Sequence, residues 1–142
     1  MSISARNVFK GQVTDIKEGP INAEVEITTP GGDKIVAMVT DSSVKSLGLA
    51  IGKDAVVVVK APWVTLLAGT PEFRFSARNQ LKGTVSGFVK GGVNCQVSVK
   101  LSGGSTVSAM ITNAAVAELG LAEGTPVVAM FKASHALVGV PV

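Results

Sequence analysis

Three pairs of cationic side chains recur in this sequence at a constant spacing of 72 positions. The pairs are Arg6 with Arg78, Lys10 with Lys82, and Lys60 with Lys132. No acidic residue has an acidic counterpart at that spacing. A guanidinium offers a planar fork of donors and an ammonium offers a point charge, and both bind oxyanions. Cations that recur without carboxylates therefore predict a repeated anion site, and they count against acid–base catalysis.

An alternative is that these cations only pair with surface carboxylates or lay their apolar stems over the surface. We favour that alternative for Lys10 and Lys82. For the other two pairs we favour the anion site.

Hydroxyl-bearing residues are matched as well, and hydroxyls donate to oxyanions. Ser4 pairs with Ser76, and Thr40 pairs with Thr112. A short helix is expected after Thr40, and the first N–H groups and the dipole of a helix attract anions. Ser43 would add a hydroxyl in the first turn. The opposing interpretation, that Ser42 or Ser43 only caps the helix, has equal weight.

Two loops of the form Gly-x-x-Asn also stand at matched positions. Backbone N–H groups of such loops can form an anion-binding nest, although an ordinary turn is the interpretation we favour. The residues of this candidate second kind of oxyanion site are Gly19, Ile21, Asn22, Gly91, Val93 and Asn94.

Residues for catalysis are not duplicated in the same way. The single histidine, His135, is matched by Trp63, and the single cysteine, Cys95, is matched by Ala23. The glycine-containing segments lack the order of a P-loop or a dinucleotide fingerprint. We therefore predict a protein that is not an enzyme, with no organic cofactor and no metal ligated directly by side chains. Cys95 and His135 are expected to have structural roles.

The constant spacing reflects a tandem repeat, since 24 of 70 aligned positions are identical without a gap. We expect two domains, at residues 1–69 and 70–142, joined near residues 68–72 where Gly and Pro favour a turn. Each unit predicts five strands and one short helix. In the first unit the strands are expected at 3–16, 22–29, 34–40, 56–59 and 63–67, and the helix begins at Asp41 or Ser42 and ends at Gly48.

That pattern predicts an all-β chain of two tandem OB-like Greek-key barrels. A unit of about 70 residues is marginally stable alone and an open barrel has exposed edges, so we expect an oligomer. The net charge of +3 with 16% charged residues is too mild for duplex-DNA binding. Matched aromatic residues for stacking on single strands are missing. No apolar stretch suits a membrane span or a signal peptide, so a cytoplasmic protein with no membrane partner is expected.

Four motifs resemble those of the Mop (TOBE-type) molybdate-binding domain. They are SARN at 4–7 and 76–79, the Gly-x-x-Asn loops, LGL at 47–49 and 119–121, and KAPWV at 60–64. Two gapless copies filling nearly the whole chain are similar to the tandem-Mop molbindins. That resemblance implies OB-like barrels and a homotrimer in the cytoplasm, which stores molybdate or tungstate as an intact oxyanion between its subunits.

The resemblance also implies the pocket residues, contributed by more than one subunit. They are Ser4, Arg6, Thr40, Ser43, Lys60 and Ala61, and in the second copy Ser76, Arg78, Thr112, Ala115, Lys132 and Ala133. Ala115 departs from the pattern because it lacks the hydroxyl of Ser43. The Gly-x-x-Asn loops are our candidates for a further site near the three-fold axis. Storage is the preferred function, a molybdate sensor or transfer protein is the alternative, and a nucleic-acid-binding OB module ranks third.

Overall fold

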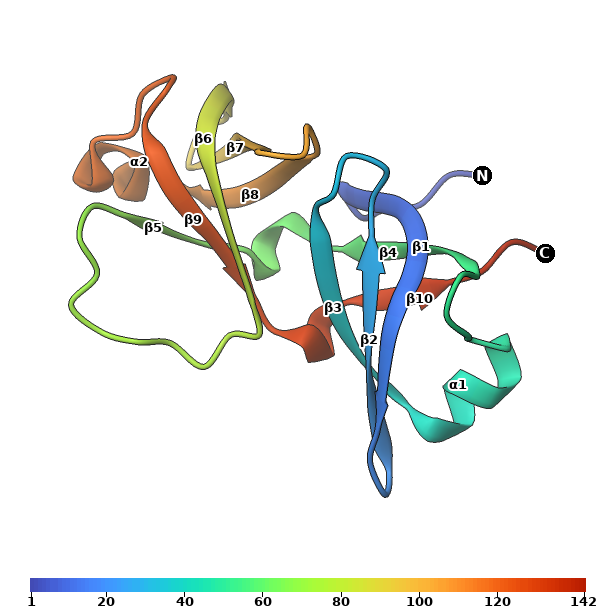
Figure 1. Cartoon of the computed structure of the whole chain (residues 1–142). Helices are drawn as coiled ribbons and strands as arrows, with labels where there is room; N and C mark the ends of the chain where they lie inside the picture. The colour runs from blue at the N-terminus through green and yellow to red at the C-terminus, as the bar shows by residue number, and fades with distance from the viewer.

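The computed structural model, which describes residues 1–142, consists of two curled five-stranded antiparallel sheets that lie side by side (Figure 1). The first repeat supplies β1 (Asn7–Glu18), β2 (Asn22–Thr28), β3 (Lys34–Thr40), α1 (Asp41–Leu47), β4 (Asp54–Val59), the 3-10 turn η1 (Ala61–Trp63) and β5 (Thr65–Ala68). The second repeat supplies β6 (Asn79–Lys90), β7 (Asn94–Leu101), β8 (Thr106–Thr112), α2 (Asn113–Leu119), β9 (Pro126–Phe131), the 3-10 turn η2 (Ala133–His135) and β10 (Leu137–Gly139).

The two repeats exchange their last strands. One sheet has the order β10-β4-β1-β2-β3 and the other has the order β5-β9-β6-β7-β8. Leu137 on β10 pairs with Val58 on β4, and Thr65 on β5 pairs with Met130 on β9. Our expectation that each repeat builds its sheet from its own five strands was therefore wrong. The division into residues 1–69 and 70–142 remains a prediction. It describes the two repeats of the sequence, and each sheet contains strands from both of them.

The ends of several elements differ from the expected ones. The first strand begins at Asn7 instead of residue 3, so Arg6 precedes the strand. The strand expected at 63–67 is present as β5 at Thr65–Ala68, and it begins later because Trp63 belongs to η1. Trp63 N donates to Lys60 O at 3.0 Å, which closes a tight turn, and Pro62 has no N–H to offer a strand partner.

The N-cap of the first short helix precedes both expected caps, Asp41 and Ser42. Thr40 is the N-cap of α1, and its side chain accepts a hydrogen bond from Ser43 N. Thr112 does the same for α2 with Ala115 N. Gly48 is confirmed as the C-cap, with φ of 62°, a left-handed conformation that glycine adopts at little cost. Each helix has seven residues, and no helix in the chain has the length and apolar character to cross a membrane.

The core is built from alternating Val, Ile and Ala side chains on the strands. Buried residues of both repeats form one continuous cluster of 26 members, which includes Val25 and Val57 from the first repeat and Val97 and Val107 from the second. Cys95 is buried within it, as expected for a small apolar side chain. A shared core and exchanged strands mean that the two repeats stabilise each other.

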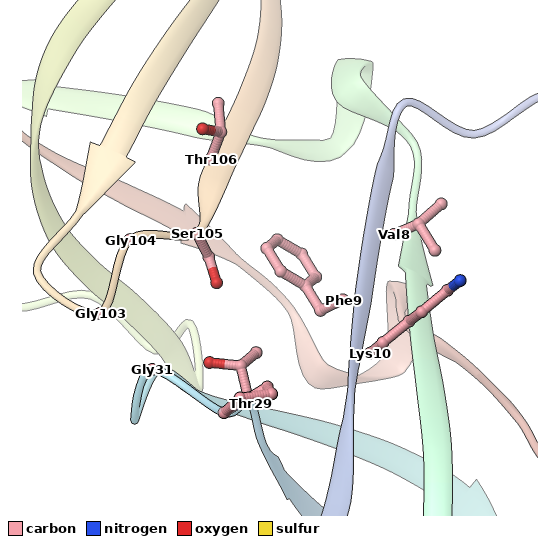
Figure 2. A pocket seen from close by; sticks show the side chains of 10 residues that line it. Val8, Phe9, Lys10, Thr29, Gly31, Gly103, Gly104, Ser105 and Thr106 are labelled. Atoms are coloured by element: carbon pink, nitrogen blue, oxygen red, sulfur yellow. The ribbon is translucent and has the colours of Figure 1, made fainter.

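The β2–β3 turn of the first repeat packs on the β7–β8 turn of the second (Figure 2). The buried Asp33 carboxylate accepts hydrogen bonds from Gly103 N at 2.9 Å and Ser105 N at 3.1 Å. A Cβ on Gly31 would overlap the carbonyl oxygen of Gly103. Phe9 points into the space beside these turns, while the Lys10 ammonium points away from it.

Replacing Gly31 by alanine should therefore separate the two turns and strain the Asp33 contacts. We expect Gly31→Ala to lower the free energy of unfolding by about 1–3 kcal/mol, the usual cost of overpacking. Gly92→Ala is the matched control, because its Cβ would meet nothing within 4 Å. Chemical denaturation of both variants measures the difference, and equal stabilities would show that the turn contact contributes nothing.

Candidate functional site

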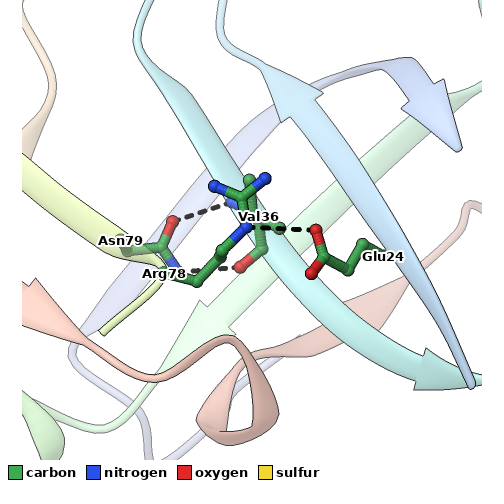
Figure 3. Close-up of polar contacts among 4 residues, drawn as sticks. All are labelled: Glu24, Val36, Arg78 and Asn79. Carbon is green, nitrogen blue, oxygen red and sulfur yellow. Dashed lines mark hydrogen bonds and ion pairs between the residues drawn. The ribbon is translucent and has the colours of Figure 1, made fainter. Parts of the chain in front are cut away.

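Two buried asparagines fix the SARN segments to the opposite repeat. Asn79 Nδ2 donates to Val36 O at 2.7 Å, and Asn79 Oδ1 accepts from Val36 N at 2.8 Å (Figure 3). Asn7 makes the same pair of bonds with Ser108 O and N, at 2.8 and 2.6 Å. Both asparagine side chains are only 2% exposed. Each amide therefore behaves as one more backbone pair on the edge strand β3 or β8.

The asparagines place the neighbouring arginines over the opposite repeat. Arg78 belongs to the second repeat, yet its Nε donates to Glu24 Oε2 on β2 of the first repeat at 3.1 Å (Figure 3). Arg6 belongs to the first repeat, yet it borders an open hollow with Gln96 and Met110 of the second. Both guanidiniums are exposed to solvent at a point fixed by a buried side chain. Such an arrangement suits the capture of an anion.

The hollow beside Arg6 includes part of the candidate second site. Lys90, Gly91, Val93 and Asn94 also line it. The structure thus brings one predicted pocket residue, Arg6, together with three residues of the candidate second oxyanion site. The N–H of Gly91 is already bonded to Asn94 O at 2.8 Å, and that of Gly19 to Asn22 O at 2.8 Å. These two amides close ordinary turns, as we favoured.

The Gly-x-x-Asn loops also anchor the helix starts. Ile21 O accepts from Asp41 N at 2.9 Å, and Val93 O accepts from Asn113 N at 2.8 Å. The Asn113 side chain adds a bond from its Nδ2 to Gly91 O at 3.0 Å. Loop and helix start therefore form one unit in each repeat.

The hydroxyls at the helix starts are partly used by the caps. Thr40 Oγ1 accepts from Ser43 N at 3.1 Å and donates to Ser43 Oγ at 2.9 Å. That arrangement leaves the Ser43 hydroxyl hydrogen free to donate. Thr112 Oγ1 accepts from Ala115 N at 3.0 Å, and Ala115 has no hydroxyl. Thr112 Oγ1 donates to no group in the chain, so each helix start has one free hydroxyl hydrogen, on Ser43 in the first repeat and on Thr112 in the second.

The Lys–Ala pairs lie where the last buried strand of each repeat turns. Lys60 and Lys132 are exposed directly after β4 and β9, and Ala61 and Ala133 are buried at the start of η1 and η2. The turns that follow meet each other, with the Trp63 and His135 rings 4.4 Å apart between centroids. His135 thus has a contact in the junction, which agrees with the structural role expected for it.

Within one chain the predicted pocket residues make contacts in several parts of the structure. Ser4 and Ser76 are exposed in segments without regular secondary structure. The side chains of Arg6 and Arg78 contact the opposite repeat, and the threonines contact their own helices. No hydrogen bond joins the SARN segments to the lysines or to the helix starts. Sequence reasoning missed Asn7, Asn79 and Glu24; the repetition of asparagine beside arginine was the available signal.

A model of the TOBE domain matches the chain twice, at residues 3–66 and 76–138. The chain belongs to the TOBE-domain family. The prediction of two tandem OB-like domains is confirmed by this match and by a solved structure. The cytoplasmic molybdate-binding protein ModG, crystallised with molybdate bound, is 53% identical with a TM-score of 0.93. That similarity covers 99% of this chain and 100% of the ModG chain.

Two curated relatives are longer than this TOBE pair. The molybdenum-pterin-binding protein MopA of Rhodobacter capsulatus is 38% identical over 141 residues. The molybdenum transport protein ModE of Herbaspirillum seropedicae is 39% identical over 140 residues. Both matches cover 99% of this chain but only 53% and 52% of the relatives. The chain therefore spans about half the length of these curated relatives.

The asparagine contacts between the TOBE domains give a second testable prediction. Asn79→Ala leaves the N–H and C=O of Val36 without their partners, so we expect a loss of about 1–3 kcal/mol in the free energy of unfolding. Asn22→Ala, at an exposed position without a side-chain hydrogen bond, should change it by less than about 0.5 kcal/mol. Thermal or chemical unfolding distinguishes the two. A fully stable Asn79→Ala protein would contradict the role assigned to this side chain.

Proposed function

We propose that the chain binds molybdate, and equally tungstate, as an intact oxyanion for storage in the cytoplasm. The observation that carries the proposal is the full-length similarity to the molybdate-bound ModG structure. The geometry supports it, because exposed Arg and Lys side chains recur at positions that buried residues hold rigidly. No organic cofactor, nucleic acid or catalytic step is part of the proposal.

Binding proceeds by capture without chemistry. The negative charge of the dianion is balanced by Arg and Lys, and its oxygens accept hydrogen bonds from hydroxyl and backbone N–H donors. No hydrogen bond joins the SARN segments to the lysines or the helix starts within one chain, and the proposed pocket takes parts from more than one subunit. Arg6 or Arg78 with its serine comes from one subunit, and a helix start with a Lys–Ala pair comes from a neighbour.

Removal of a recurring cation tests the proposed pockets. Arg78→Ala or Lys60→Ala should weaken molybdate binding at its own class of pocket by about 1.5–3 kcal/mol, the range for charge-assisted hydrogen bonds. Lys10→Ala is the control, because it removes the same single positive charge. The Lys10 ammonium points away from the space beside the β2–β3 and β7–β8 turns, and we assign it to the surface. Calorimetric titration with sodium molybdate measures each affinity. Equal losses in all three variants would indicate a diffuse field instead of defined pockets.

The proposed pockets require an oligomer, and we propose a homotrimer. An apolar groove that includes Ile3, Val56, Val58 and Leu137 is exposed along β4 and β10, which supports burial against another copy. Light scattering should give a mass of about three times 14.4 kDa. A monomer at micromolar concentration, both with and without molybdate, would contradict pockets between subunits.

A role in sensing or transfer is the second candidate. The molybdenum transport protein ModE contains a segment similar to this whole chain within a protein about twice as long. A protein of this kind would present its oxyanion-loaded state to a partner. Affinity capture of partners in the presence and absence of molybdate separates this role from storage.

A further inference from the structure

The two arginine positions are equivalent in sequence but face different charges. Arg78 lies against Glu24, whereas the residue at the matched place beside Arg6 is Gln96. The difference extends to the neighbouring loops, because Glu18 of the first repeat is matched by Lys90, which lines the hollow beside Arg6. Arg78 therefore lies against a carboxylate, whereas the hollow beside Arg6 is lined by the amide of Gln96 and the ammonium-bearing Lys90.

The pairing of β2 with β3 places Glu24 beside Arg78. Glu24 lies on β2 opposite Met38 of β3, the same strand whose Val36 is bonded to Asn79. The backbone beside Arg78 is therefore fixed relative to β2 and β3. The Arg78 and Glu24 side chains, 49% and 33% exposed, then meet at 3.1 Å from Nε to Oε2. No ion pair is formed by Arg6.

We propose that Glu24 is a built-in competitor for Arg78, which makes the two classes of oxyanion pocket unequal. We name them the Arg78 pocket and the Arg6 pocket after their guanidiniums. This inference rests on the proposed function, since it concerns the affinity of those pockets. Glu24 occupies the Nε–H donor of Arg78, so an oxyanion that uses this donor must displace a carboxylate oxygen. An oxyanion that uses the other N–H donors of the guanidinium still binds close to a like charge. An oxyanion at Arg6 meets no such charge, and Gln96 can donate from its amide nitrogen.

The exposure of the pair decides which effect dominates. Exposed ion pairs are weak in themselves, so the loss of the Arg78–Glu24 bond is a small part of the penalty. The larger part is repulsion between the carboxylate and a doubly charged ligand, which is long-ranged at low ionic strength and screened by salt. The competition should therefore weaken as salt is added.

The test uses one class of pocket at a time in the full-length chain. In an Arg6→Ala background only the Arg78 pocket keeps its guanidinium, and there Glu24→Gln should raise the affinity for molybdate roughly tenfold at low salt. In an Arg78→Ala background, Gln96→Glu should lower the affinity of the Arg6 pocket by a similar factor. Both effects should shrink toward no change near 1 M NaCl, where the Debye length is about 3 Å.

Glu26→Gln is the matched control in the Arg6→Ala background. It changes the net charge by the same amount on the same strand, but the Glu26 carboxylate is bonded to Thr14 Oγ1 at 2.7 Å instead of to Arg78. Titration calorimetry measures each affinity, and thermal unfolding checks that the variants fold. Glu24→Gln and Gln96→Glu are nearly isosteric and act in different domains, so each tests the inference independently.

Four outcomes would overturn the inference. Unchanged affinity in Glu24→Gln, or an equal rise in Glu26→Gln, would mean that Glu24 does not compete specifically for Arg78. An effect that persists at high salt would assign it to altered structure instead of charge. If the unaltered chain binds no molybdate, the proposed function fails and this inference fails with it. If the unaltered chain binds molybdate but Glu24→Gln does not change the affinity, only this inference is overturned and the proposed function stands.

Discussion

Backbone hydrogen bonding along β4 and β9 is the constraint on which the rest of the structure depends. Each of these strands lies in the interior of a sheet and has only one neighbour, β1 or β6, within its own repeat. Residues such as Val57 and Phe131 are buried there, and unpaired backbone groups beside them would be costly. The missing neighbour comes from the other repeat, as β10 or β5. Neither sheet is complete without both halves of the chain.

The same reciprocity determines where the recurring cations lie. The last strands cross from one repeat to the other, and the first strands begin with an asparagine bonded to the other repeat's edge. Each arginine therefore belongs to one repeat in sequence and lies against the other repeat in the structure. A change on β2 consequently alters the environment of Arg78, 54 positions away in sequence. The two repeats can thus diverge in charge while keeping the same backbone.

Local sequence signals predicted the elements well. Alternating apolar residues predicted strands at 22–29 and 34–40, which correspond to β2 and β3, and Gly48 marked the end of α1. These features depend on interactions between near neighbours in the chain. The recurring cations and the motif resemblance likewise led to the family that the TOBE match shows.

The contacts between repeats could not be predicted in that way. The choice between β5 and β10 as the partner of β4 involves two short strands of similar character, and no local pattern distinguishes them. Asn79 is a polar residue at the start of a strand, which normally indicates exposure, and its burial depends on a partner 43 positions away. The contact of Arg78 with Glu24 follows from the same long-range pairing.

The stacking of Trp63 on His135 gives the molecule a natural optical label. The chain contains one tryptophan and one histidine, and they face each other where η1 of one repeat meets η2 of the other. Indole emission depends on the groups in contact with the ring, so all tryptophan fluorescence of this chain originates at the junction between the repeats. The intensity and wavelength of this fluorescence therefore report how the two repeats pack against each other, without any dye or added residue.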